Sequence, residues 1–190
     1  MPSAEIQTDE IVRDALQTGK KVFVPYLYKH PDPPSNTPKS VMDMVDLRSI
    51  SDYDSLKRDS WGIPTIESST VGKRERILGE SPKDASPAGL DMILLPGVAF
   101  EKDAATGVIK RLGHGKGFYD YFMHRYLENK RGDDSREAPE SDVYLIGLAL
   151  GEQYLRSDAD LTVPVGQLDH RLHGLVVGTG EIVESNATDS

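Results

Sequence analysis

Met92-Ile93-Leu94-Leu95-Pro96-Gly97 is the stretch that decides the fold. A short apolar run that ends at a proline and a glycine is typical of a strand buried on both faces of a sheet. Residues 144–150 and 175–177 have the same character, and a helix with apolar residues at helical spacing is expected to begin near Phe118. This alternation predicts an α/β fold: a single three-layer domain whose mainly parallel sheet is flanked by helices.

The chain before this stretch is expected to contain a helix followed by a strand. Thr8 is a good N-cap residue, the acids at positions 9 and 10 suit the positive end of a helix, and Gly19 is a typical terminator. Residues 22–24 then predict a short strand, and residues 41–45 predict another. A helix that leads into a strand is the second half of a βαβ crossover, so we expect the opening strand of that crossover to be missing from this chain.

Several polar segments are expected to lie outside the core. Residues 30–40 hold four prolines and predict an exposed loop, and residues 67–90 and 130–142 are polar with little hydrophobic periodicity. The last residues, 184–190, predict a disordered tail. We therefore expect one domain over residues 1–183 that is interrupted by these three loops.

Composition excludes several classes of function. The chain has 190 residues, 37% of them hydrophobic, and a net charge of −9. The absence of cysteine excludes a disulfide framework, a zinc–thiolate site and a thiol nucleophile. The acidic charge argues against a nucleic-acid partner, and the longest mainly apolar run, residues 92–100, is too short to span a membrane. We expect a cytoplasmic monomer with neither a nucleic-acid nor a membrane partner.

Arg111-Leu112-Gly113-His114-Gly115-Lys116-Gly117-Phe118-Tyr119-Asp120 is the segment expected to carry chemistry. Its three glycines alternate with other residues directly before a helix, so backbone N–H groups can approach an anion at the positive end of the helix dipole. Lys110, Arg111 and Lys116 add positive charge, and the pattern is neither a Walker nor a Rossmann motif. The alternative, a tight structural turn with a solvated lysine, stays open from the pattern alone.

One carboxylate of this segment is a candidate ligand for Mg²⁺, an ion that needs only one or two protein carboxylates. Asp120 lies in the first turn of the predicted helix, where it either caps the helix or faces a bound phosphate. Asp169 is a second loop carboxylate just before the last strand, and by itself it is an ordinary turn residue. His170 and His173 are three residues apart, but no third ligand accompanies them, so no zinc site is expected there.

These segments together resemble the 5-formyltetrahydrofolate cyclo-ligase family. The similarity includes the apolar strand with its Pro-Gly and the segment 111–120, where the family has Arg-Leu-Gly-Arg-Gly-Lys-Gly-Tyr-Tyr-Asp. It extends in order over nearly the whole chain and also includes residues 20–25, Met42-Asp43-Met44, Ser60-Trp61-Gly62-Ile63-Pro64, Gly147-Leu148-Ala149-Leu150 and residues 163–169.

The resemblance implies an ATP- and Mg²⁺-dependent ligase that forms a C–N bond. The formyl oxygen of 5-formyltetrahydrofolate, with or without a polyglutamate tail, takes the γ-phosphoryl group of ATP and releases ADP. N10 then attacks the activated carbon, phosphate leaves, and 5,10-methenyltetrahydrofolate is formed. Such chemistry depends on positioning and charge neutralisation more than on a protein nucleophile.

The same resemblance implies roles for individual residues. It assigns ATP binding to Arg111, Leu112, Gly113, His114, Gly115, Lys116, Gly117, Phe118 and Tyr119, with Lys116 and Tyr119 as catalytic residues. It assigns folate binding to Glu5, Trp61, His114, Gly115, Lys116, Gly117 and Phe118, although Trp61 is equally interpretable as a core or interface residue. It assigns Mg²⁺ binding to Asp120 and Asp169.

Three departures from the family pattern leave a second hypothesis open. The family opens with a basic helix and a first strand that are expected to be absent here, and His114 and Phe118 replace an arginine and a tyrosine. The alternative is therefore a catalytically impaired folate- or nucleotide-binding relative, or a fragment that lacks the ATP-binding helix. Because the N-terminus is expected to be incomplete, a mitochondrial location also stays open. An unrelated phosphate-binding α/β module ranks last.

Overall fold

Residues 6–29, 38–60, 62–79, 89–132, 143–156, 161–166 and 169–186 are described by the computed structural model of the chain. They form two compact units: residues 7–79 with residue 89, and residue 6 with residues 90–186. The sequence predicts one domain over residues 1–183. In the structure, each unit has its own sheets, because the described strands of each half pair with strands of the same half. The two units are therefore described in turn.

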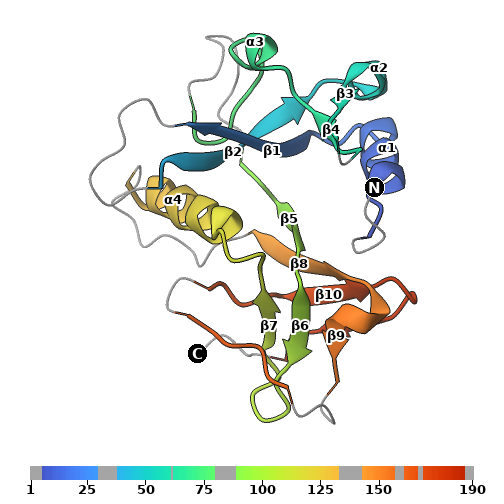
Figure 1. Ribbon diagram of the computed structural model, residues 1–190, viewed down its shortest axis with the longest axis vertical. Coiled ribbons are helices and arrows are strands. Elements are labelled where there is room, and N and C mark those ends of the chain that lie inside the picture. Colours follow the sequence, from blue (N-terminus) through green and yellow to red (C-terminus); the bar gives the residue numbers. More distant parts are fainter. Residues whose placement is uncertain are drawn as a thin grey trace. The chain divides into compact units, whose positions relative to one another are not determined.

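The first unit is built on a two-stranded antiparallel sheet. β1 (Val22–Lys29) pairs with β2 (Ser40–Leu47) along its whole length (Figure 1). The sequence correctly predicts both strands, and the structure shows that they are antiparallel partners. The alternating exposure along β1 is typical of an antiparallel strand. The remaining elements are α1 (Asp9–Gln17), α2 (Ile50–Ser55), β3 (Lys57–Arg58), β4 (Pro64–Thr65) and α3 (Ser68–Val71).

Helix α1 begins and ends where the sequence predicts. Thr8 occupies the N-cap position, although its side chain makes no capping hydrogen bond. Gly19 follows the helix with φ 76°, a left-handed conformation that favours glycine. One apolar face of the helix, which includes Val12 and Leu16, packs against the core of this unit. The buried members of that core are Val45, Leu47, Tyr53, Ile66 and Val71.

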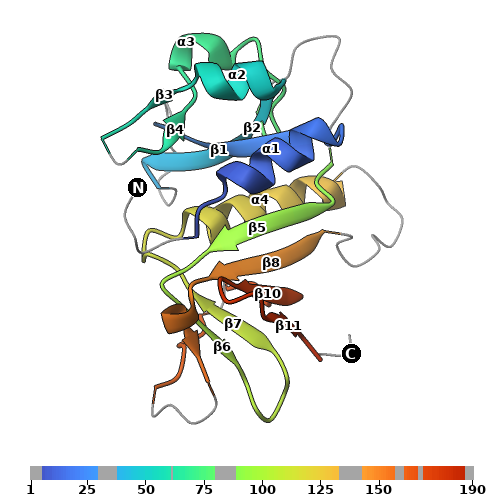
Figure 2. The same ribbon diagram turned by 90° about the vertical axis from the view of Figure 1, so that its right-hand side faces the viewer.

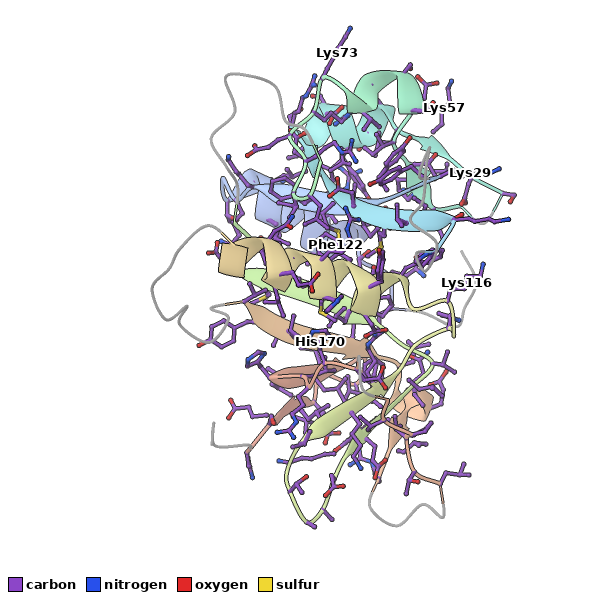
Figure 3. The ribbon with its side chains drawn as sticks, turned by 90° about the vertical axis from the view of Figure 1, so that its left-hand side faces the viewer. Lys29, Lys57, Lys73, Lys116, Phe122 and His170 are labelled. Carbon is purple, nitrogen blue, oxygen red and sulfur yellow. The ribbon has the colours of Figure 1, made fainter. Side chains whose placement is uncertain are left out.

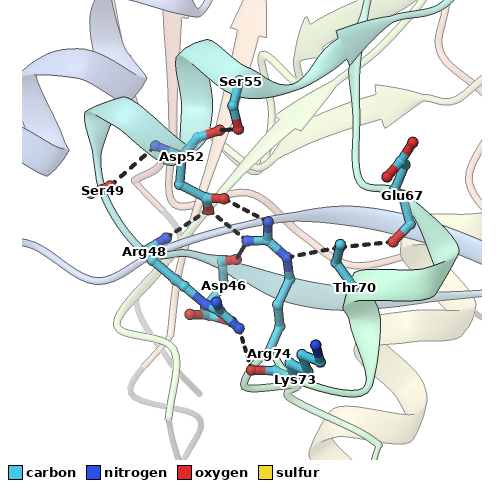
Figure 4. A network of polar contacts seen from close by, with 9 residues as sticks. All are labelled: Asp46, Arg48, Ser49, Asp52, Ser55, Glu67, Thr70, Lys73 and Arg74. Carbon is cyan, nitrogen blue, oxygen red and sulfur yellow. Dashed lines mark hydrogen bonds and ion pairs between the residues drawn. The ribbon is translucent and has the colours of Figure 1, made fainter.

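A buried ion pair joins α2 to the segment that follows α3 (Figure 4). Both terminal nitrogens of Arg74 donate to the carboxylate of Asp52, each at 2.6 Å, and Nη1 also donates to the Asp46 carbonyl at 2.9 Å. Ser49 caps α2 by accepting the Asp52 N–H at 3.1 Å. Arg74 is only 4% exposed, so the pair is partly protected from water and fixes the chain after α3.

Asp43 of β2 forms a second buried ion pair. Its side chain is fully buried and accepts Nε of Arg76 at 2.8 Å and the N–H groups of Met44 and Leu78 at 2.7 and 2.9 Å. The carboxylate therefore has partners for both of its oxygens. These contacts hold residues 74–78 in place. The predicted loop 67–90 is wrong for residues 68–71, which form α3, whereas residues 72–79 contain turns, bends and one isolated bridge. Residues 80–88 lie outside the described residues.

The Asp52–Arg74 pair predicts a pH-dependent stability. The Arg74 guanidinium holds the pKa of Asp52 below its ordinary value. Ionised Asp52 therefore stabilises the fold above the unfolded-state pKa, near 3.8, and this contribution is lost as the pH falls through the lower folded-state pKa. Asp52→Asn should reduce the free energy of unfolding by about 2 kcal/mol at pH 7, and by less at pH 3.

Urea unfolding of wild type and variant at pH 7 and pH 3 measures this difference. Asp14→Asn is the matched control, because Asp14 is an exposed helical acid that makes no ion pair with the described residues. A deficit in Asp52→Asn that stayed equal at both pH values would show that the carboxylate charge is not the stabilising feature.

The second unit contains the predicted parallel sheet. Its strand order is β11–β10–β8–β5, and β5 (Met92–Pro96), β8 (Tyr144–Ala149) and β10 (Gly174–Val177) are mutually parallel (Figure 2). β11 (Ile182–Glu184) is antiparallel to β10. The three apolar runs of the sequence are thus confirmed as the three parallel strands. One face of the sheet is buried and carries Ile93, Leu95, Leu145, Ala149, Leu175, Val177 and Val183.

A second sheet of three strands approaches this buried face. Its order is β7 (Ile109–Leu112), β6 (Ala99–Lys102) and β9 (Tyr154–Leu155), and the short 3₁₀ helix η1 (Gly151–Gln153) precedes β9. Gly147 of β8 marks the closest approach. A Cβ atom there would lie 2.7 Å from Phe100 and 2.9 Å from Leu172, so the position accepts only glycine without rearrangement of the packing.

Helix α4 (Phe118–Gly132) connects β7 to β8 and runs alongside β5 (Figure 2). It begins where the sequence predicts and buries Phe122, Met123 and Tyr126. The hydroxyl of Tyr126 accepts the Leu90 N–H at 2.8 Å. The helix extends to residue 132, so the predicted loop 130–142 begins too early, and residues 133–142 lie outside the described residues. In the described ranges, no helix combines the length and the apolar character needed to cross a membrane.

The C-terminal segment is ordered further than the sequence predicts. Glu184 belongs to β11, the Ser185 N–H donates to the His173 carbonyl at 3.0 Å, and the Asn186 N–H donates to the Gly107 carbonyl at 3.2 Å. The predicted disordered tail is therefore wrong for residues 184–186, because their backbone groups find partners far away in the sequence. Residues 187–190 lie outside the described part of the chain, as do residues 30–37 of the predicted proline-rich loop.

Candidate functional site

The glycine-rich loop between β7 and α4 has the backbone shape that its sequence predicts. Gly115 and Gly117 have φ angles of 78° and 63°, in the left-handed region where only glycine is at ease. A Cβ atom built on either residue would meet no described atom within 4 Å. The loop therefore needs glycine for its conformation and not for close packing, and the space in front of it is open.

The same loop presents backbone donors. The first helical hydrogen bond of α4 runs from the Tyr121 N–H to the Gly117 carbonyl, at 2.9 Å. Within the described part of the chain, no group accepts the N–H of Gly115, Lys116 or Phe118. Successive N–H groups in a turn with alternating φ signs form a concavity that binds anions, here directly before a 15-residue helix.

Lys116 supplies a mobile positive charge beside these donors. Its side chain extends from the loop away from the ribbon of this unit, and the residue is exposed (Figure 3). No hydrogen bond or ion pair joins it to another described residue. His114 and Gly115 are exposed on the same loop, and Phe118 begins the helix. The predicted loop residues are thus brought together at one solvent-facing turn.

Arg111 is held at the base of the loop by contacts with three neighbouring elements. Its side chain is almost buried, and its Nη2 donates to Oδ1 of Asp120 at 2.6 Å. Nη1 donates to the Pro96 carbonyl at 3.1 Å, and the guanidinium carbon lies 5.9 Å from the centre of the Tyr119 ring. Arg111 therefore joins the end of β5, the end of β7 and the first turn of α4.

Lys110 is directed to the β6–β7 hairpin and is already paired. Its Nζ lies 2.7 Å from Oδ2 of Asp103 and 3.9 Å from Oε1 of Glu101. The lysine holds the pKa of the Asp103 carboxyl well below its usual range, and N–H groups at Thr106 and Ala105 add to the effect. The charge of Lys110 is therefore balanced within the hairpin, and Lys116 is the lysine of this region that faces solvent.

Asp169 lies in a loop that borders a cavity. Its Oδ2 accepts the Gly166 N–H at 2.6 Å, and its own N–H donates to the Gly166 carbonyl at 3.3 Å. The cavity has a volume of about 630 Å³. Its lining includes Arg111, Asp169 and Lys110, so the two segments that carry predicted site residues meet at one cavity.

The two predicted metal ligands offer the right kind of donor for Mg²⁺. Asp120 and Asp169 each use one carboxylate oxygen in the contacts given above, and none of the described residues engages the second oxygen of either. Such hard oxygen donors suit Mg²⁺, which keeps several waters and takes few protein ligands. The described residues contain no cluster of three or more acidic or histidine side chains arranged around a metal position.

The described residues do not include every predicted site residue. Glu5 and Trp61 lie outside the described residues. His173 has a structural role, because its Nδ1 accepts the N–H of Leu145 at 2.9 Å at the edge of the β8–β10 ladder. The sequence places Asp103 at the tip of the hairpin, but it does not indicate that Glu101 and Asp103 pair with Lys110. The Asp-x-x-Thr-Gly pattern at residues 103–107 is the signal for this turn.

A sequence model of the 5-formyltetrahydrofolate cyclo-ligase family matches residues 1–178. The chain belongs to this family. Among curated proteins, it is 34% identical to the probable 5-formyltetrahydrofolate cyclo-ligase of Caenorhabditis elegans over 92% of this chain and 68% of the relative. It is 33% identical to the mouse cyclo-ligase over 78% of this chain and 58% of the relative. It is 27% identical to the probable cyclo-ligase of Schizosaccharomyces pombe over 93% of this chain and 70% of the relative.

The matched part of the chain therefore spans 58–70% of the length of these three cyclo-ligases. Membership of the cyclo-ligase family confirms the family that the sequence resembles. The matched residues include the glycine loop and Lys116.

The left-handed φ angles of Gly115 and Gly117 predict that a side chain at either position lowers the stability of the fold. Gly115→Ala should destabilise the fold by about 1 kcal/mol, because alanine is strained at φ 78° although no atom obstructs its Cβ. Gly72→Ala is the matched control: Gly72 also has open space around it, but its φ of −65° suits any residue. Thermal unfolding of both variants measures the difference. Equal melting temperatures would show that the loop relaxes to a right-handed conformation at no cost.

Proposed function

We propose that this cyclo-ligase relative converts 5-formyltetrahydrofolate and ATP to 5,10-methenyltetrahydrofolate, ADP and phosphate, with Mg²⁺. One observation carries the proposal. The glycine loop lies directly before the N-terminus of the 15-residue helix α4, has open space in front of it, and carries an exposed lysine. A triphosphate fits this combination, because backbone N–H groups and a flexible ammonium can both follow its oxygens.

The residues in and around the loop have different roles in the proposed reaction. Lys116 and the loop N–H groups bind the transferring phosphoryl group and offset the negative charge that accumulates on it. Tyr119, which lies under the Arg111 guanidinium, is held in a fixed orientation beside the loop. Asp120 and Asp169 would hold Mg²⁺, and the ion would neutralise phosphate charge. Because Arg111 occupies one oxygen of Asp120, it fixes the orientation in which the other oxygen is presented.

Two observations support 5-formyltetrahydrofolate as the second substrate: the names of the relatives and the open space beside the loop. The relatives' names specify 5-formyltetrahydrofolate as the compound on which those proteins act. Glu5 and Trp61 stay candidates for folate contacts, together with His114, Gly115, Lys116, Gly117 and Phe118. Polyglutamylated folates, a monomeric state and a cytoplasmic location stay predictions from the sequence.

A direct assay distinguishes an active ligase from the alternative, a catalytically impaired binding relative. The purified chain is incubated with 5-formyltetrahydrofolate, ATP and Mg²⁺, and the absorbance of 5,10-methenyltetrahydrofolate is followed. Product formation that needs all three components supports the proposal. ATP binding by calorimetry without any turnover would favour the impaired relative, and absence of both would contradict the proposed nucleotide site.

Lys116→Ala should weaken ATP binding about 10-fold and leave the melting temperature unchanged. The expected loss corresponds to roughly 1.4 kcal/mol, about one charge-assisted contact, and the fold is spared because Lys116 has no described structural partner. Calorimetric titration with ATP measures the affinity. The control is Lys29→Ala, since Lys29 is also an exposed lysine but lies at the end of β1 in the first unit (Figure 3). Equal affinities in the two variants would remove Lys116 from the site.

A further inference from the structure

The loop that carries Asp169 is attached to the β6–β7 hairpin at two points. Before Asp169, the Val163 N–H donates to Oε2 of Glu101 on β6 at 2.6 Å. After Asp169, the Leu172 N–H donates to the Ile109 carbonyl of β7 at 3.1 Å. The second attachment uses backbone groups alone and is insensitive to side-chain identity. The first depends on a single carboxylate.

Glu101 is placed to make this attachment rigid. On β6 it lies opposite Lys110 in the antiparallel pair with β7, and its neighbour on the other side is Leu155 of β9. Its side chain is only 14% exposed, and Lys110 lies 3.9 Å from its other oxygen. Val163, whose N–H it accepts, is 3% exposed. A buried N–H that loses its acceptor is costly, so the carboxylate fixes the position of Val163.

The attachment leads directly to the proposed metal ligand. From Val163 the chain reaches Gly166, whose N–H is held by Oδ2 of Asp169 at 2.6 Å. On the hairpin, Arg111 follows Lys110, and Arg111 holds Asp120. One hairpin therefore positions both predicted Mg²⁺ carboxylates, Asp120 through Arg111 and Asp169 through Glu101.

We propose that Glu101 is a positioning residue for Asp169, holding the Asp169 loop at the edge of the cavity that Arg111 also lines. The proposal rests on the proposed role of Asp169 as a metal ligand. Glu101 touches neither nucleotide nor metal in this arrangement. It acts through the Val163 N–H, and its loss allows the loop to move away from the hairpin.

Metal binding by the intact chain tests this role without turnover. Mn²⁺, with ADP present, is titrated into wild type and variants, and free Mn²⁺ is followed by electron paramagnetic resonance. Glu101→Ala should weaken Mn²⁺ binding about 10-fold, as is usual when the group that orients a metal ligand is removed. Glu101→Gln keeps an oxygen acceptor and should restore most of the affinity. Glu67→Ala, which removes an exposed acid from the first unit, should leave the affinity unchanged.

A double-mutant cycle separates this proposal from the proposed function. If Glu101 acts through Asp169, Glu101→Ala should weaken Mn²⁺ binding in the wild-type background and have no further effect in Asp169→Asn. Equal losses of Mn²⁺ affinity in both backgrounds would overturn the positioning role. It would also be overturned if Glu101→Ala accelerated hydrogen exchange of the Val163 amide and left the Mn²⁺ affinity unchanged. If Asp169→Asn alone binds Mn²⁺ normally, Asp169 is no ligand. That outcome overturns the inference and the proposed metal site together, while leaving ATP binding by Lys116 as an independent result.

Discussion

The ion pair between Arg111 and Asp120 is the contact on which the candidate site depends. It closes the glycine loop at its base, because Arg111 lies near the end of strand β7 and Asp120 in the first turn of α4. Between these held ends, Gly115 and Gly117 adopt the left-handed angles that the turn requires. The nearly buried guanidinium also donates to the Pro96 carbonyl, so hydrogen bonds in two directions fix its orientation. The loop thus combines an open front with a rigid base, which suits a site that must receive a large anion.

Apolar patterning predicted the second unit well. The three runs that begin at Met92, Tyr144 and Leu175 became parallel strands, and the spacing of Phe122, Met123 and Tyr126 identified the buried face of α4. Such patterns are local, so they can be read without knowledge of the fold. Strand partners are not local. The antiparallel pairing of β1 with β2, and the division into two units, depend on which strands meet and could not be deduced from the runs.

The positions and partners of charged residues were predicted less well than those of apolar residues, because the partners of a charged side chain can lie far away in the sequence. The segment 67–79 looked mobile because it is polar, yet Arg74 and Arg76 are fixed by Asp52 and Asp43, which lie 22 and 33 residues earlier. In the site, the sequence treated Lys110 and Lys116 as equivalent positive charges. Strand alternation turns Lys110 to the acids of the hairpin, whereas Lys116 is in a turn and reaches solvent. The motif predicted where the loop is, and partners distant in sequence determined which of its charges are available.

The contact between Asn186 and Gly107 links the length of the hairpin to the course of the C-terminal segment. The Gly107 carbonyl accepts the Asn186 N–H, and a Cβ atom on Gly107 would lie 2.9 Å from the Asn186 side chain. A hairpin tip that gained or lost a residue would move this carbonyl and remove one of the hydrogen bonds that hold the segment after β11. The two segments are therefore constrained to change together during evolution. In a comparison of relatives, insertions at the tip of this hairpin should be accompanied by altered C-terminal ends, although nearly eighty positions separate them along the chain.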